Sequence, residues 1–224
     1  MIKFENYEVV GWEHAIRGMR NPKNSWDRSD SDYGDLWDEE NTIIGTDYRN
    51  YEIGPNDREL MMKLAKGGPV HAKYRRMITV YVDITAPLYW WKEFDTYKVG
   101  TVCNSCSTMH KIHAKPFTMS DFSCEHLNEN SANLLGVIID DLNYYRDEYN
   151  NTNCDGIYKK ELWYQMIQLL PTSYNQKRTI MLNYEVLANI YSSRKNHKLD
   201  EWHKFCDFIE GLPYSEIITG GKDE

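Results

Sequence analysis

"LLPTSYNQKRTIMLNYEVLANIYSSR", residues 169–194, is the stretch that decides the fold. Its first three residues close an amphipathic helix predicted over 155–171 and form a turn. A short strand-like segment follows at 177–185, and a further helix is predicted over 185–196. A helix, a turn, a strand and a second helix in direct succession indicate mixed α and β structure.

A second strand and helix lie upstream, in residues 76–98. The segment RMITVYVDITAP alternates Ile78, Val80, Val82 and Ile84 on one face, which predicts a strand. Pro87 then opens the aromatic segment PLYWWKEFDTYK, and proline is well suited to a first helical turn. We therefore expect a strand followed directly by a helix that is rich in tryptophan and tyrosine.

The remaining segments extend this pattern with one further strand and four further helices. The strand is predicted at 4–11 and the helices at 12–22, 54–68, 130–149 and 200–212. Helices dominate and strands lie among them, so the predicted class is α+β. No internal repeat and no linker rich in glycine or proline is visible, so a single domain over 1–224 is expected.

Residues 24–52 stand apart by their composition, being acidic and rich in Asp, Ser and Gly. Runs of charge usually face solvent, so we expect a long surface loop inserted into the domain. Trp26, Tyr33 and Trp37 are embedded in it and are expected to pin it down.

Charge and composition exclude several classes of function. The formal net charge of −8 argues against general affinity for nucleic acids or anionic membranes. No apolar run is long enough to span a bilayer, and the N-terminus lacks the pattern of a secretory signal. Five cysteines in such a chain favour reduced thiols over a disulfide framework. We therefore expect a cytoplasmic protein without nucleic-acid or membrane partners.

The segment TYKVGTVCNSCSTMHKIH, residues 96–113, leaves several alternatives open. Cys103, Cys106, His110 and His113 have side chains that ligate zinc, but a second knuckle at a conventional separation is missing. Cys103 or Cys106 near His110 also resembles a nucleophile and its base, although no third, orienting residue is identifiable. Upstream, the basic residues of 71–76 are equally compatible with phosphate binding and with protection of a strand edge.

The order of these segments resembles the flavin-dependent thymidylate synthase (ThyX) family. In that family a strand ending near "AP" leads into the signature R-H-R-x-x-S-x-N-E-x-S-x-R-Y, which falls on residues 96–109 here. Lys98 keeps a cation and Thr101 keeps a hydroxyl in that register. A slip of one residue instead keeps Asn104 and Ser107, and the signature's arginines and glutamate are absent in either register.

The C-terminal half carries the resemblance further. Asn183 falls on the asparagine that contacts the flavin, and Arg194 falls on the arginine that contacts the pyrimidine base. His197 lies in the stretch that holds the flavin's adenine, Lys177 near a basic residue after the turn, and Arg20 on an N-terminal arginine.

The resemblance implies a ThyX-like fold with a small, mostly antiparallel sheet, assembled as a homotetramer. It also implies FAD as cofactor, a small-molecule nucleotide as substrate, and NADPH and methylenetetrahydrofolate as co-substrates. The implied reaction is reductive one-carbon transfer to a pyrimidine nucleotide, from dUMP to dTMP. Arg194 would be catalytic, and the cofactor-binding residues would be Lys98, Thr101, Asn183 and His197. The substrate-binding residues would be Arg20, Asn104, Cys106, Ser107 and Lys177.

Two alternatives remain beside this reading. The missing signature residues favour a catalytically inactive or repurposed ThyX-like protein that binds a nucleotide or a protein partner. The four possible zinc ligands keep open a small zinc-binding protein. A divergent protein of nucleotide metabolism would also suit a phage or a mobile element.

Overall fold

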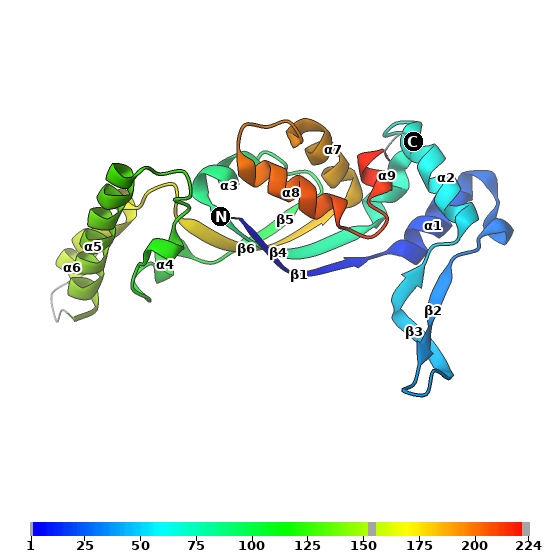
Figure 1. Ribbon diagram of the computed structural model, residues 1–224, viewed down its shortest axis with the longest axis horizontal. Helices are drawn as coiled ribbons and strands as arrows, with labels where there is room; N and C mark the ends of the chain where they lie inside the picture. Colours follow the sequence, from blue (N-terminus) through cyan, green and yellow to red (C-terminus); the bar gives the residue numbers. More distant parts are fainter. Residues whose placement is uncertain (1, 152–155, 221–224) are drawn as a thin grey trace. The chain divides into compact units, whose positions relative to one another are not determined.

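The computed structural model describes residues 2–151 and 156–220, and it has the predicted α+β class (Figure 1). The strands are β1 (Lys3–Val10), β2 (Asp32–Trp37), β3 (Ile43–Glu52), β4 (Thr79–Pro87), β5 (Val102–Ser105) and β6 (Asn175–Asn183). The α-helices are α1 (Trp12–Arg20), α2 (Pro55–Lys66), α3 (Leu88–Phe94), α4 (Thr108–Lys111), α5 (Glu129–Asn151), α6 (Gly156–Leu169), α7 (Tyr184–Arg194), α8 (Asp200–Glu210) and α9 (Glu216–Thr219). Four short 3₁₀ helices complete the described chain: η1 (Asn21–Lys23), η2 (Trp26–Arg28), η3 (Ala72–Met77) and η4 (Met119–Asp121).

The predicted strands and helices are confirmed in type and approximate position. Each of the three predicted strands corresponds to β1, β4 or β6, and the aromatic segment after Pro87 forms α3. Residue 155 of the predicted helix over 155–171 lies outside the described residues, and the remainder forms α6.

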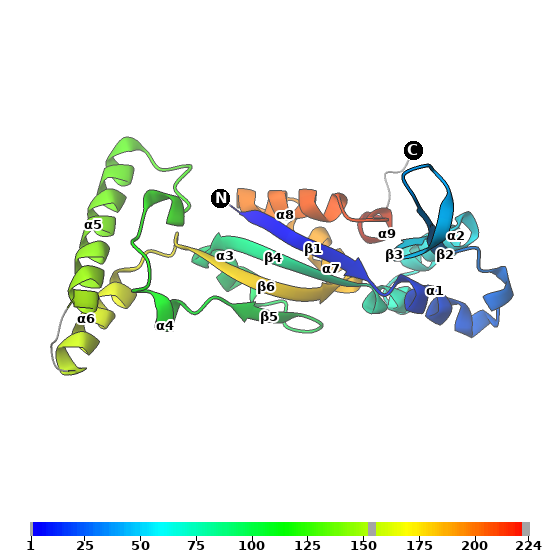
Figure 2. The ribbon, with the colours of Figure 1, turned by 90° about the horizontal axis from the view of Figure 1, so that it is seen from below.

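A small four-stranded sheet organises the strands in the order β1-β4-β6-β5. The arrows of β1, β4 and β6 alternate in direction, as expected for a mostly antiparallel sheet (Figure 2). On β4 the predicted alternation is confirmed, because Val80, Val82 and Ile84 are buried. The intervening residues of the strand include Asp83 and Thr85, so one face of β4 is apolar and the other is polar.

Contacts between Cα atoms divide the chain into two compact units, each assembled from separate stretches. The first unit comprises residues up to 5, 83–97 and 103–180, and the second comprises 6–82, 98–102 and 181 onward. The single domain expected from the sequence stays a prediction.

The first unit has its core under the helical hairpin α5–α6, whose two helices lie side by side (Figures 1 and 2). Leu135, Ile139 and Leu142 of α5 and Met166 of α6 pack against apolar side chains of the segment 112–122. Trp91 of α3 is fully buried, and its indole Nε1 donates to the carbonyl of Gln176 at 2.9 Å. The burial of these side chains supplies most of the free energy that holds the unit together.

The second unit has a core of aromatic side chains from α1, α7 and α8. Trp12 packs edge-to-face on Tyr184, with ring centroids 5.3 Å apart, and the hydroxyl of Tyr184 donates to the carbonyl of Pro213 at 2.6 Å. Trp202 and Phe205 of α8 are fully buried as well. Within residues 2–151 and 156–220, no helix combines the length and the apolar character needed to cross a membrane.

The acidic segment 24–52 differs from its prediction as a surface loop. It contains η2 and an antiparallel hairpin of β2 and β3, in which Asp32 pairs with Glu52 and Tyr33 with Tyr51. The acidic side chains do face solvent, but they alternate with aromatic and aliphatic residues that favour strands. Of the three aromatic residues expected to pin the segment, Tyr33 donates to Glu13 at 2.9 Å and Trp26 donates from Nε1 to the side chain of Asn21 at 2.8 Å. Trp26 and Trp37 are both half-exposed.

Candidate functional site

The segment that carries the degenerate signature lies against the start of β6 in the first unit. The amide of Cys106 donates to the carbonyl of Lys177 at 3.0 Å. The side-chain amide of Gln176 in turn donates to the carbonyl of Cys106 at 3.0 Å and to the hydroxyl of Thr108 at 2.9 Å. Ser107 is the N-cap of α4, since its Oγ accepts from the amide of His110. The predicted residues Cys106 and Ser107 are thereby fixed beside Lys177.

These residues border a cavity of about 520 Å³ within the first unit. Phe117 and Tyr174 supply aromatic walls, and Thr85, Thr108 and Gln176 supply polar groups. A volume of this size is typical of pockets that bind small molecules. Two aromatic rings beside convergent polar groups suit a planar ligand with a polar edge. We refer to this cavity as the β6 pocket.

The charges around the β6 pocket are unevenly compensated. The ammonium of Lys177 lies 3.1 Å from Glu5 and 3.3 Å from Asp83, and the hydrogen bonds to these carboxylates raise the pKa of Lys177. Lys111 and Lys115 also line the pocket, and no carboxylate pairs with either among the residues described. The positive charge available to an anionic ligand therefore comes from these two lysines rather than from Lys177.

The predicted cofactor residues Lys98 and Thr101 belong to a short segment of the second unit, 98–102. Gly100 in this segment has φ +77°, and a Cβ atom there would lie 3.0 Å from the side-chain nitrogen of Asn183. The segment therefore passes close to the start of α7 and needs a glycine to do so. Thr101 has a buried Oγ1 without a hydrogen-bond partner among residues 2–151 and 156–220, whereas Lys98 is exposed. A buried hydroxyl without a protein partner is unusual, and either a bound water or a ligand atom would satisfy it.

Asn183 has a clear role within the protein itself. Its Oδ1 accepts hydrogen bonds from the amides of Glu185 and Val186, each at 3.1 Å, and thus caps α7. The side-chain nitrogen faces Gly100. The cap fixes the start of the helix that ends at Arg194.

Arg194 and His197 meet Trp202 at the other end of α7. The guanidinium of Arg194 lies 4.6 Å from the centre of a Trp202 ring, and the rings of His197 and Trp202 are 6.2 Å apart. The Nδ1 of His197 accepts from the amide of Leu199 at 3.2 Å, so Nε2 carries the proton in the neutral ring. Three of the predicted residues are thus placed by one helix, because Asn183 caps the start of α7, Arg194 is its last residue and His197 follows its end.

Arg20, predicted to bind substrate, is almost fully buried. Its Nε donates to Asp57 at 2.6 Å and its Nη1 to the carbonyl of Ser25 at 3.1 Å. Burial alone would raise the pKa of Asp57, but hydrogen bonds from Ser29, Ser31 and Arg20 outweigh it and hold the pKa below its ordinary value. This ion pair accounts for the burial of Arg20, and its contact with substrate stays a prediction.

The four possible zinc ligands have different surroundings. Cys103 accepts a hydrogen bond from Arg178 at 3.7 Å, and the ring of His113 packs on Tyr149 with centroids 4.6 Å apart. His110 is exposed on α4, as is Cys106 just before that helix. Within the described part of the chain, no three His, Cys, Asp or Glu side chains are grouped to hold a metal ion. The zinc geometry suggested by the spacing is therefore not formed here.

Sequence reasoning missed three of the side chains that build the β6 pocket. Tyr174 and Gln176 lie just after the turn that opens the deciding stretch, and Lys115 follows α4. The lysines of the segment 111–115 can be seen in the sequence. Because this segment is far from β6 along the chain, the sequence did not show that the two line the same pocket. Asn104 is exposed on β5, which leaves its predicted contact untested.

Comparison with known proteins identifies the fold. No protein-family model matches the sequence, and no curated protein matches it. Among solved structures, a thymidylate synthase X (ThyX) from Helicobacter pylori with FAD and dUMP is similar with a TM-score of 0.61 at 15% identity, covering 96% of this chain and 94% of that one. Another structure of the flavin-dependent ThyX from Helicobacter pylori, complexed with FAD and dUMP, gives a TM-score of 0.59 at 15% identity, covering 96% and 95%. The protein therefore has a ThyX-like fold.

Proposed function

We propose that this protein is an FAD-dependent enzyme that transfers a one-carbon group reductively to a pyrimidine nucleotide, converting dUMP to dTMP. The observation that carries the proposal is the β6 pocket, which joins the residues of the signature segment to two lysines within a ThyX-like fold, and no described carboxylate pairs with either lysine. The two similar structures contain FAD and dUMP. A nucleotide needs flat walls for its base and cations for its phosphate, and the pocket offers both.

The residues of the second unit fit a flavin cofactor. Thr101 has a buried hydroxyl without a partner, which would donate to a cofactor oxygen or accept from a ring nitrogen. Arg194 and His197 are partly exposed over the fully buried Trp202, and they offer a cation and an aromatic ring beside which a flat heterocycle would stack. When bound, FAD supplies the hydride, and the protein positions and polarises the reactants.

In the proposed roles, Arg194 donates to a carbonyl oxygen of the pyrimidine and stabilises the negative charge that develops there. Asn183, His197, Lys98 and Thr101 contact the flavin. Asn104, Cys106 and Ser107 contact the nucleotide, and Lys111 and Lys115 hold its phosphate. NADPH and methylenetetrahydrofolate would be the co-substrates, and the enzyme would act in the cytoplasm as a homotetramer.

The direct test is the visible absorbance of the purified full-length protein before and after incubation with FAD and removal of excess ligand. A retained flavin spectrum with one FAD per chain supports the proposal. Protein that stays colourless after incubation contradicts the proposal that FAD is the cofactor. Conversion of dUMP to dTMP with NADPH and methylenetetrahydrofolate, or rescue of a thymidine auxotroph, then tests the reaction itself.

A second candidate is a ThyX-like protein that binds a nucleotide without catalysis. It is favoured by Thr96, Asn104 and Thr108, which stand where one register of the signature has two arginines and a glutamate. Lys177 forms ion pairs with Glu5 and Asp83, so its charge is not available to the phosphate of a nucleotide. Calorimetric binding of dUMP by protein that neither retains FAD nor forms dTMP would identify this candidate.

A further inference from the structure

The hairpin of β2 and β3, residues 32–52, presents an unusual surface and is called the acidic arm here. Leu36, Trp37, Ile43, Ile44 and Tyr48 expose between 43% and 77% of their surface. The same residues 32–52 carry seven acidic side chains and a single arginine, so most of the chain's net charge of −8 lies on the arm. Figure 1 shows the arm extending beyond α1 and α2 of its own unit.

An isolated two-stranded ribbon with exposed apolar side chains is poorly stabilised in water. A hairpin alone is marginally stable, because it lacks a third strand or a helix to cover its apolar face. Tyr33 and Tyr51 pack together near its base, at 5.0 Å between centroids, but the apolar residues toward the tip stay exposed. Contiguous exposed apolar residues ringed by charge typically mark a protein–protein contact.

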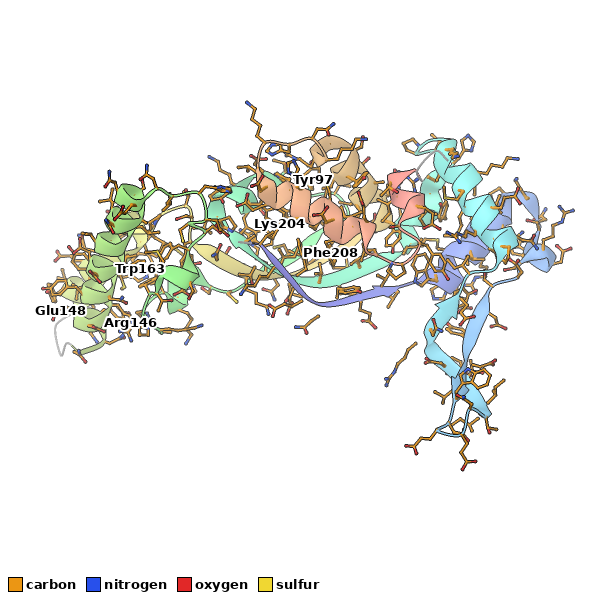
Figure 3. All side chains as sticks on the ribbon, viewed as in Figure 1. Tyr97, Arg146, Glu148, Trp163, Lys204 and Phe208 are labelled. Carbon is orange, nitrogen blue, oxygen red and sulfur yellow. The ribbon has the colours of Figure 1, made fainter. Side chains whose placement is uncertain are left out.

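The opposite character appears on the first unit, in a groove between α4 and the helical hairpin α5–α6. This basic groove has a volume of about 650 Å³ and is lined by His110, His113, Tyr149, Lys159, Lys160 and Trp163, among others. Trp163, labelled in Figure 3, donates from Nε1 to the carbonyl of Met109 at 2.8 Å and so joins α6 to α4.

Among the described residues, no carboxylate compensates the positive charge of the two lysines in the basic groove. Lys159 lies 5.7 Å from the ring centre of Tyr149, and Lys160 lies 5.9 Å from that of Tyr164. Neither lysine pairs with a carboxylate among residues 2–151 and 156–220. Burial and the charges of Lys111 and Arg146 lower the pKa of His113, so the two lysines supply the charge.

We propose that the acidic arm of one copy of this chain docks into the basic groove of a second copy. The arm offers carboxylates around Trp37 and Ile44, and the groove offers unpaired ammonium groups around aromatic rings. Charge complementarity of this kind steers association and fixes the register of the partners. Because arm and groove are different surfaces, each contact leaves one free arm and one free groove until the assembly closes.

The contact would lie next to the β6 pocket without depending on the pocket's ligand. Met109 and His110 of α4 line the groove, whereas Thr108 and Lys111 of the same helix line the β6 pocket. A docked arm would therefore press on one side of the helix whose other side faces the pocket. The inference holds whether or not the protein binds a flavin.

The test is charge reversal on both surfaces of the full-length protein. One variant carries Asp38→Lys, Glu39→Lys and Glu40→Lys on the arm, a second carries Lys159→Glu and Lys160→Glu in the groove, and a third combines all five changes. The dissociation constant between copies is measured by analytical ultracentrifugation at low salt. We expect each single-surface variant to weaken association by about tenfold or more, and equimolar mixing of the two variants to restore it.

Matched controls reverse the same charges elsewhere. Asp140→Lys with Asp141→Lys on α5, and Lys198→Glu with Lys204→Glu on and before α8, should associate as the original chain does. The proposal also requires association to weaken as salt is raised. A protein that is monomeric at all concentrations tested overturns it, and so do single-surface variants that behave like the controls. The proposal is also overturned if neither the variant with all five changes nor the equimolar mixture of the two single-surface variants restores association.

Discussion

Lys111 and Lys115 are the residues on which the proposed phosphate contact rests. They line the β6 pocket, and no carboxylate of residues 2–151 and 156–220 pairs with them, whereas Lys177, the cation expected from the sequence, is held by Glu5 and Asp83. The reason is positional: Glu5 and Asp83 lie 172 and 94 residues from Lys177 in the chain. Only the pairing of β1, β4 and β6 brings the three side chains together.

We predict that Lys111→Ala weakens the binding of dUMP by about 10- to 100-fold, because a hydrogen bond to a charged group contributes about 1.5–3 kcal/mol. Isothermal titration calorimetry measures the dissociation constant. Lys204→Ala, which removes an exposed lysine of α8, is the control and should leave binding unchanged. If Lys111→Ala and Lys111→Arg have the same dissociation constant for dUMP, the side chain of Lys111 does not hold the phosphate.

Asp57 provides a residue-scale prediction about stability and acid. It is fully buried and ionised against Arg20, with further hydrogen bonds from Ser29 and Ser31. The folded protein holds its pKa below that of the unfolded chain, which is about 3.9. The resulting stabilisation is complete above about pH 4 and is lost as the pH falls through the folded pKa.

We therefore expect Asp57→Asn to lower the free energy of unfolding at neutral pH by about 3–5 kcal/mol, since it leaves the guanidinium of Arg20 without its counter-charge. Urea unfolding from neutral pH down to about pH 3 should also show a shallower acid loss for this variant than for the original protein. Ser29→Ala gives a milder loss if Asp57→Asn does not fold. Asp27→Asn, at an exposed position, is the control, and an identical acid profile for Asp57→Asn would disprove the assignment.

At the scale of elements, the start of α7 is fixed by the asparagine that precedes it. As N-cap it satisfies the amides of Glu185 and Val186, and its nitrogen approaches Gly100. Sequence comparison with ThyX proteins suggested only a flavin contact at this position. The capping role follows from local chemistry that the segment LNYEV already contained, because asparagine before a helix start is a favoured cap.

We predict that Asn183→Ala costs about 1 kcal/mol of stability through loss of the cap, and that Asn183→Asp restores most of it. Thermal unfolding of the three proteins measures this. Flavin binding separates the roles: a cofactor contact by the amide nitrogen requires Asn183→Asp to lose FAD affinity while keeping stability. If Asn183→Asp and the original protein bind FAD equally, Asn183 is a capping residue and nothing more.

The hairpin β2–β3 is the element that sequence reasoning described least well. The sequence correctly predicted that its acidic side chains face solvent. It did not predict the two strands, because acidic residues interrupt the apolar alternation. Two irregularities in the register, after Tyr33 and after Leu36, further disturb the period of two. In the four-stranded sheet, β4 was easier to recognise, since burial of one face enforces a regular pattern, whereas the exposed strand β5 was missed.

At the scale of the whole molecule, ligand binding should appear as a change in stability. A ligand that binds only the folded state raises the free energy of unfolding by about 2.7 kcal/mol at one hundred times its dissociation constant. We expect FAD to raise the melting temperature, and dUMP to raise it further in the presence of FAD. Differential scanning calorimetry measures both, with riboflavin and uridine as phosphate-free controls. Equal shifts from ligands and controls would argue against phosphate recognition.

The sequence by itself determined the α+β class, the order of β1, β4, β6 and the longer helices, and the resemblance of that order to ThyX proteins. These features are local, because apolar periodicity, proline and capping residues act over a few positions. The tertiary structure decided which charged side chains form ion pairs with one another. It paired Arg20 with Asp57 and Lys177 with Glu5 and Asp83, and among the described residues no carboxylate pairs with Lys111, Lys115, Lys159 or Lys160. Charge pairing depends on distances in space between residues far apart in the chain, and no local pattern encodes those distances.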